Sequence, residues 1–242
     1  MKGADTRSGF TILEVILFLA ISGLMFTGII AGFGGIINNQ RYDDSVSSLQ
    51  DFIQNQFSIA SNVRNSRPTD QVCTATGISG GTTMPRGTSN CIVVGRIINA
   101  EPSDNGRRLI ANTVYATADT YNDSSTEEVL LSSLGLIPSP NTDSLEQYDT
   151  RWQTELQVSG VPAQFSILIL RLPTTGIIRT YILNTNPTVS SWSNYWTSSE
   201  DNVEICVNSN GLTAIPTQGV RVLSGATGSS GVQRIAVSDG VC

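Results

Sequence analysis

Residues 9–37 read GFTILEVILFLAISGLMFTGIIAGFGGII, an almost wholly apolar stretch that begins close to the first residue of the chain. Residues 15–37 carry no charge, and at 1.5 Å per residue a helix over them is about 35 Å long, enough to span a bilayer. The stretch contains one acid, Glu14, near its start. A carboxylate at membrane depth costs a few kcal/mol unless it finds a partner, so its presence needs a reason.

Composition excludes several classes of function. The chain has 242 residues, a net charge of −6, a single lysine at Lys2 and no histidine. An acidic chain without a basic run argues against general binding of nucleic acid, which depends on neutralising phosphates. Without histidine, Ser-His-Asp, Cys-His and His-zinc sites are excluded. We expect no enzymatic activity, no metal and no cofactor.

The polar residues 1–9 form a short leader that contains Lys2 and Arg7. In a secretory signal the small residues follow the apolar stretch, whereas here Gly9 precedes it. Cleavage after Gly9 leaves the apolar helix on the mature chain. The leader cations are expected on the cytoplasmic side, which places the remainder of the chain outside the membrane.

The sequence Gly9-Phe10-Thr11-Ile12-Leu13-Glu14 resembles the prepilin cleavage motif of type IV pilins and of the type II secretion pseudopilins. The resemblance is close over residues 7–63. It implies cleavage after Gly9 by a membrane prepilin peptidase and N-methylation of the new N-terminus at Phe10. The precursor is then expected in the bacterial cytoplasmic membrane, and the mature chain in a helical surface pilus with other pilins.

The same resemblance implies an assembly platform and motor ATPases as partners, and roles in motility, adhesion or DNA uptake. Alternatives are a low-abundance minor or tip pilin, or a secretion pseudopilin, that binds DNA, a glycan or a host cell. A hydrolase anchored by its N-terminus is a third class, but no residue set forms a catalytic site.

Glu14 has two interpretations. The freed amine of Phe10 in a neighbouring subunit can neutralise the carboxylate and set the register of assembly, as a buried polar group does in a coiled coil. Alternatively, Glu14 lies at the interface among lipid headgroups without a specific partner.

Four glycines crowd the second half of the apolar stretch: Gly28, Gly32, Gly34 and Gly35. Each costs about 1 kcal/mol in a helix interior relative to alanine. They predict a soft spot where the helix stretches in a filament, or close helix packing through Gly28 and Gly32, or tolerance of glycine by the membrane.

An amphipathic pattern follows over residues 38–65. Apolar side chains recur at steps of three and four, which predicts that the same helix leaves the membrane and buries one face in a soluble head. The stripe consists of Tyr42, Val46, Leu49, Ile53, Phe57, Ala60 and Val63. We expect the helix to end near Asn65, since Pro68 disfavours helix in the residue before it.

Residues 66–242 are predicted to form a β-rich head, which makes the fold α+β: a long N-terminal helix packed on an antiparallel sheet. Residues 66–90 and 138–141 are predicted loops, and 125–134 a short helix with Glu127 and Glu128 in its first turn. Turn signals separate β-branched runs at 91–98, 108–117, 151–160, 164–172, 177–184, 203–208, 219–224 and 232–238. The segment from Val203 to the C-terminus is loosely similar to pseudopilins of the GspH/FimT type.

Four cysteines in a chain with a membrane-targeting start predict two disulfides in an oxidising compartment. Three pairings are open. Sequence order favours Cys73–Cys91 with Cys206–Cys242, because each pair closes a local loop.

The head offers weak candidates for ligand binding. Trp192, Tyr195 and Trp196 suit recognition of a glycan or a protein partner, with core packing as the alternative. Residues 122–124 and 200–204 carry oxygen ligands without a known calcium spacing, which favours solvated turns. The pair Arg107-Arg108 suits an edge strand that resists aggregation better than a DNA contact.

Overall fold

The computed structural model describes residues 9–63, 71–74, 77–81, 85, 88–100, 104–117, 127–140, 145–173, 175–185, 192–211 and 216–236. Residues 1–8 of the predicted leader and residues 122–124 lie outside this set, as does Cys242. The described part is α+β, with one long helix and antiparallel sheets, as the sequence predicts.

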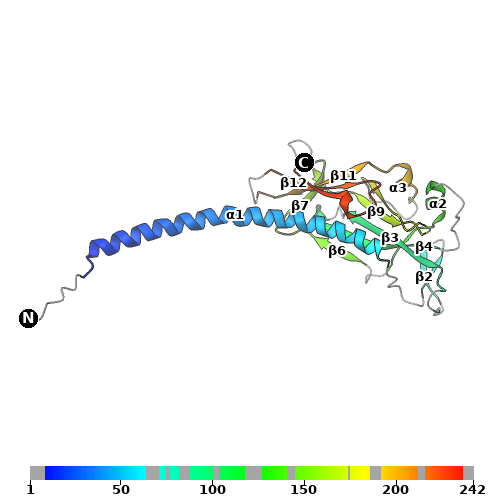
Figure 1. The fold of residues 1–242 in the computed structure, drawn as a ribbon, viewed down its shortest axis with the longest axis horizontal. Helices are drawn as coiled ribbons and strands as arrows, with labels where there is room; N and C mark the ends of the chain where they lie inside the picture. The colour runs from blue at the N-terminus through cyan, green and yellow to red at the C-terminus, as the bar shows by residue number, and fades with distance from the viewer. Residues whose placement is uncertain are drawn as a thin grey trace, which may run out of the picture.

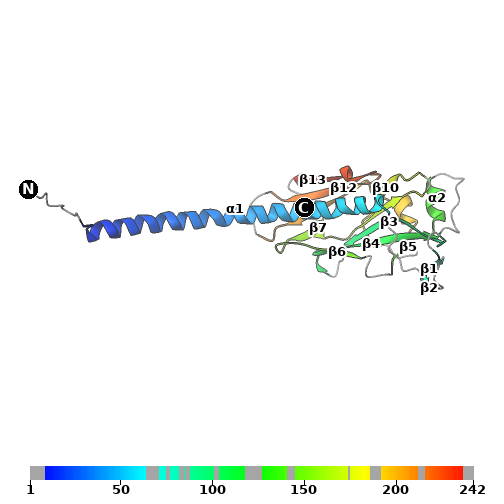
Figure 2. The same cartoon turned by 60° about the horizontal axis from the view of Figure 1, so that its bottom comes forward.

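Helix α1 (Ile12–Ser61) runs unbroken for 50 residues. Its first half projects away from the head, and its second half lies along the head (Figures 1 and 2). Thr11 caps its start, and at its end the Asn62 N–H donates to the Ser58 carbonyl oxygen at 3.0 Å. The helix therefore ends four residues before the predicted end at Asn65. No other helix in the described part of the chain is long and apolar enough to span a membrane.

The head contains two main sheets rather than the single one predicted. In the first, the strand order is β10 (Ile178–Leu183), β9 (Ser166–Arg171), β3 (Cys91–Ala100), β4 (Arg108–Thr117), β5 (Ile137–Pro138), and β6 (Glu146–Asp149) also pairs with β4. In the second, the order is β13 (Val232–Ala236), β12 (Gln218–Leu223), β11 (Asn202–Asn208), β7 (Glu155–Val158), β8 (Val161–Pro162). All of these pairs are antiparallel.

The second half of α1 forms one core with both sheets. The side chains of Tyr42, Val46, Leu49, Ile53, Phe57 and Ala60 are at most 3% exposed, and they pack with Ile98, Ile167, Ile205 and Val220. The predicted apolar stripe is confirmed up to Ala60, whereas Val63 beyond the helix is exposed.

A second core fills the opposite face of the first sheet. Strands β3 and β9 send alternate residues to each side, so that Ile167 and Ile169 face α1 while Leu168 and Leu170 face away. Short helices α2 (Glu127–Ser133) and α3 (Asn194–Thr197) cover the far face, and the one-turn helix η5 (Ser229–Gly231) precedes β13.

Three sequence predictions in the head are corrected. Residues 71–74 and 77–80 form a hairpin, β1 (Gln71–Thr74) with β2 (Gly77–Gly80), inside the predicted loop. The strand predicted over 151–160 is limited to β7, because Trp152 and Gln153 adopt positive φ of 57° and 61° and form a turn. The third correction adds strands β5 and β6, which the sequence does not predict because they are too short to give a periodic signal.

Cysteine placement confirms one predicted disulfide. Cys73 in β1 bonds Cys91 at the start of β3, which ties the hairpin to the first sheet. Cys206 is also disulfide-bonded. Because Cys242 lies outside the described residues, one disulfide rather than two is assigned here, and the Cys206–Cys242 pairing stays a prediction.

Candidate functional site

Gly9 and Phe10 lie in exposed, non-helical backbone directly before α1. The Phe10 side chain is 85% exposed. The peptide bond between them is the predicted cleavage point. This bond lies outside α1, which begins at Ile12, and cleavage there stays a prediction.

Glu14 completes a capping box with Thr11. The Thr11 N–H donates to Glu14 Oε2 at 3.2 Å, and the Glu14 N–H donates to Thr11 Oγ1 at 3.3 Å. Each side chain thus satisfies a backbone donor that helix geometry leaves without a partner. The signature Thr-x-x-Glu is readable in the sequence, and the sequence interpretation missed it. Glu14 therefore has a local role within one chain, in addition to the predicted pairing between subunits.

The apolar half of α1 is not covered by any other element in the described part of the chain. No residue in the most apolar 18-residue stretch of this helix is buried, and the length and composition of the helix suit a membrane span. The two hydroxyl groups on this half are satisfied by the helix itself, since Ser22 donates to the Phe18 carbonyl at 2.7 Å and Thr27 to the Gly23 carbonyl at 2.8 Å. The helix therefore presents an almost purely apolar surface that water cannot stabilise, which suits lipid or other apolar helices.

The glycines Gly28, Gly32, Gly34 and Gly35 lie within continuous helix. A Cβ at any of these positions would meet nothing within 4 Å. Packing inside the single chain therefore does not require them. Their predicted roles, as a soft spot or as a surface for close helix contact, concern other subunits and stay predictions.

A buried polar network joins α1 to the first sheet. The Arg96 side chain is 4% exposed, its Nε donates to Gln56 Oε1 at 2.9 Å and its Nη1 donates to Thr113 Oγ1 at 2.8 Å. Gln56 in turn donates to Glu146 Oε2 at 2.8 Å, and Arg96 Nη2 lies 3.6 Å from Glu146 Oε1. Burial lowers the pKa of Arg96, and the Glu146 charge opposes that shift. Sequence reasoning missed this network because its members are far apart along the chain.

Mainly polar side chains of α1 and of the adjoining strands and turn contact one another where the helix enters the head. We call this set the neck and define it as Arg41, Asp43, Asp44, Arg151, Trp152, Gln218 and Arg234. Asp44 accepts from the indole N–H of Trp152 at 3.1 Å and lies 3.5 Å from Arg151, while Asp43 pairs with Arg234. Just inside the neck, Tyr42 donates to the Val207 carbonyl at 2.7 Å, and burial raises its pKa. These contacts fix the helix to the head at the point where its exposed half begins.

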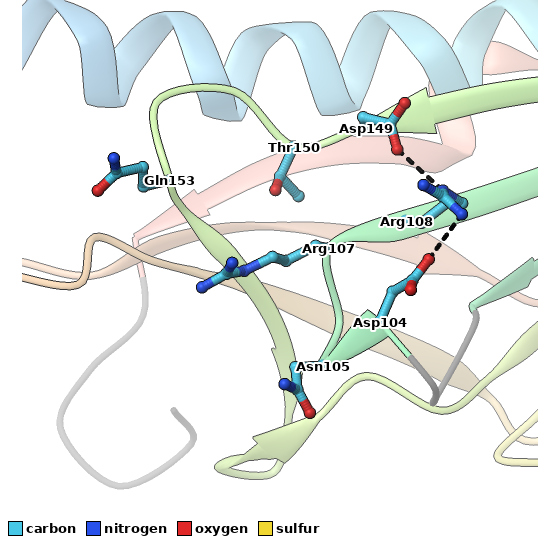
Figure 3. Close-up of a pocket in the computed structure, with 7 residues that line it drawn as sticks. All are labelled: Asp104, Asn105, Arg107, Arg108, Asp149, Thr150 and Gln153. Carbon is cyan, nitrogen blue, oxygen red and sulfur yellow. Dashed lines mark hydrogen bonds and ion pairs between the residues drawn. The ribbon is translucent and has the colours of Figure 1, made fainter.

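Arg107 and Arg108 line an open polar cavity of about 530 Å³, together with Asp104, Asn105, Asp149, Thr150 and Gln153 (Figure 3). Both cations have acidic partners: Arg107 lies 2.6 Å from Glu155, and Arg108 lies 2.8 Å from Asp104 and 2.9 Å from Asp149. Arg108 lowers the pKa of Asp149, and Arg107 lowers that of Glu155. The carboxylates thus offset both arginine charges at this cavity, and the expectation against DNA binding stays a prediction.

The aromatic cluster is largely part of the second core. Tyr195 is fully buried, Trp192 and Trp196 are half-buried against the same core, and the rings of Trp192 and Tyr195 stack with centroids 5.7 Å apart. Burial raises the pKa of Tyr195, and the Ser166 hydroxyl offsets part of that shift. Packing therefore accounts for these residues, and a ligand role for them stays a prediction.

The remaining candidates within the described residues have structural roles, while residues 122–124 lie outside that set. Helix α2 begins at Glu127, so Glu127 and Glu128 occupy its first turn as predicted. Glu204 pairs with Arg221 through two hydrogen bonds. Across the described ranges, no group of three or more His, Cys, Asp and Glu side chains is arranged to hold a metal ion.

Comparisons of the chain with protein-family models, with curated proteins and with solved structures found no match. The fold and the site therefore define a class only: an α+β protein whose N-terminal apolar helix has the length and composition of a membrane span.

Proposed function

We propose that this chain is a pilin, a structural subunit of a bacterial type IV pilus or a related filament. The observation that carries the proposal is the exposed apolar half of α1, which follows directly on the Gly9-Phe10 bond and its Thr11–Glu14 cap. Such a helix needs one apolar environment before assembly and another after it. The membrane supplies the first, and the helices of neighbouring subunits in the filament core supply the second.

The shape of the molecule supports this proposal. The exposed half of α1 extends away from the head in a gentle curve, and the head lies at the other end of the molecule (Figures 1 and 2). Subunits of this shape can bundle their helices in a central core and place their heads outside without collision. The head itself is joined to the second half of α1 by the shared core and by the Arg96 network.

Processing and location of the chain test the proposal. Surface filaments are sheared from cells, and the N-terminus and abundance of this chain are measured by mass spectrometry. An abundant chain that begins at N-methylated Phe10 is the expected result for a major subunit. The same terminus at trace level indicates a minor or tip pilin, and a processed chain absent from the surface indicates a pseudopilin. An intact Met1 terminus confined to membranes would overturn the proposal and leave an anchored surface protein.

A further inference from the structure

Trp152 is a large apolar side chain held at the surface of the neck. It is 45% exposed, and its φ of 57° is rare for a bulky residue. The guanidinium carbon of Arg41 lies 4.7 Å from the centre of its ring, and its indole N–H donates to Asp44. Backbone strain of this kind persists only where the surroundings hold it, and here the contacts with Arg41 and Asp44 hold the Trp152 side chain in place.

The contacts of Trp152 place it close to the end of the apolar surface. The exposed apolar side chains end at Ile37, and Trp152 is bound to α1 at Arg41 and Asp44. At 1.5 Å per residue these two positions lie about 6 and 10 Å beyond Ile37 along the helix axis. The headgroup layer of a bilayer leaflet is about 5–8 Å thick, so the ring lies at its outer edge when the helix stands upright.

The apolar helix is slightly longer than the hydrocarbon core. Residues 15–37 span about 35 Å against about 30 Å, so the helix is long enough to span with some tilt, and interfacial anchors such as Trp and Arg set the direction of that tilt. Trp152 is held against the side of α1 by Arg41 and Asp44, so a tilt of the helix toward this side lowers the ring toward the headgroups. Because α1 is continuous through the neck, the head leans with the helix. The ring then enters the headgroup layer.

The chemistry of the neck favours this direction of tilt. Tryptophan concentrates at membrane interfaces because its ring is apolar and its N–H is polar, and arginine stems extend toward headgroups. Arg41 and Arg151 flank the ring, and the nearest carboxylate, Asp44, is already engaged by Trp152 and Arg151. Lipid phosphates on this side of the neck therefore meet the guanidinium group of Arg41, with the Asp44-paired Arg151 beside it.

We propose that Trp152, with Arg41 and Arg151, anchors the head in the phospholipid headgroup layer before assembly, so that the β6–β7 side of the head leans onto the membrane. The proposal rests on the membrane stage of the proposed function, but it does not require that the chain assemble into a filament.

Tryptophan fluorescence tests the proposal, because the three tryptophans all lie in the head and the apolar helix has none. The full chain is reconstituted in vesicles of phosphatidylcholine, either unmodified or brominated on the acyl chains near the headgroup. Bromine quenches only the tryptophans that it approaches. We expect the brominated vesicles to remove up to about one third of the emission, the share of one residue in three.

Two substitutions identify the residue responsible. The W152F chain is expected to lose the quenching, whereas the W196F control is expected to keep it, because Trp196 is in α3 toward the opposite end of the head (Figure 1). Flotation of each chain with the vesicles checks insertion separately. A chain that floats but shows no quenching, or W152F quenched as strongly as the wild type, would overturn the anchor alone. A chain that does not float would overturn the membrane stage as well.

Discussion

Glu14 has one role within the chain and a second, predicted role in assembly. Its carboxylate caps α1 within one chain, while the resemblance to pilins assigns it a charge pairing with Phe10 of a neighbour. Glutamine at the same position keeps the capping box but removes the charge, so substitution can separate the two roles.

We predict that E14Q preserves the cap and processing after Gly9 but lowers incorporation into filaments at least about tenfold, the effect of an unpaired amine in an apolar core. E14A removes both roles and should incorporate no better. The measurement is the ratio of this chain in sheared filaments to that in membranes, for each variant. Normal incorporation of E14Q together with failure of E14A would show that the cap alone matters.

Arg96 is the polar residue on which the junction of helix and head depends. Its substitution leaves the fully buried Gln56 and Thr113 without their charged donor and opens a cavity. We predict that R96A lowers the free energy of unfolding by about 3 kcal/mol, measured by urea denaturation of the full chain in detergent. The matched control is R107A, whose pair with Glu155 is exposed and should contribute less than about 1 kcal/mol. Equal losses in the two variants would contradict a special role for the network.

At the scale of elements, the close approach of β3 to β9 depends on Gly95. A Cβ there would collide with the backbone carbonyl of Ile169, and the register of β3 against β4 shifts between Val93 and Gly95. Glycine is therefore the residue that lets β3 bend and still pair on both edges.

We predict that G95A destabilises the first sheet by about 2–3 kcal/mol, since backbone rather than a side chain must move. In the control G80A, the added methyl group meets nothing within 4 Å and the backbone is not left-handed, so the effect should stay within about 0.5 kcal/mol. Both are measured from the midpoint of thermal unfolding of the full chain. A G95A midpoint equal to that of G80A would refute the close approach.

At the scale of the whole molecule, α1 is half membrane-type surface and half core. We predict that a chain beginning at Asn38 is a folded, water-soluble monomer, whereas a chain beginning at Arg64 does not fold. The second truncation removes six nearly fully buried side chains, which contribute about 10 kcal/mol, comparable with the whole stability of a domain. Size-exclusion chromatography and circular dichroism distinguish the two. A soluble, folded head without residues 38–63 would contradict a shared core.

Much of this architecture was predictable because its signals are local and periodic. The apolar stretch, the amphipathic stripe from Tyr42 to Ala60 and most of the long strands depend on spacing along one segment. The strand at residues 108–117 was predicted with the bounds that the structure has. The hairpin β1–β2 and strands β5 and β6 were not predicted, because a strand of two to four residues is too short to show the alternation of apolar and polar side chains.

The sequence by itself determined the long helix, the β-rich head and the Gly9-Phe10 motif, since each is written in consecutive residues. Only the tertiary structure decided that the strands form two sheets, that Arg96 and Gln56 meet, that Trp192 and Tyr195 pack inward, and that Trp152 is held beside Arg41 at the neck. These features join residues far apart in the chain. The stabilising free energy of these contacts comes from burial and hydrogen bonding between distant segments. No short segment of sequence therefore predicts them.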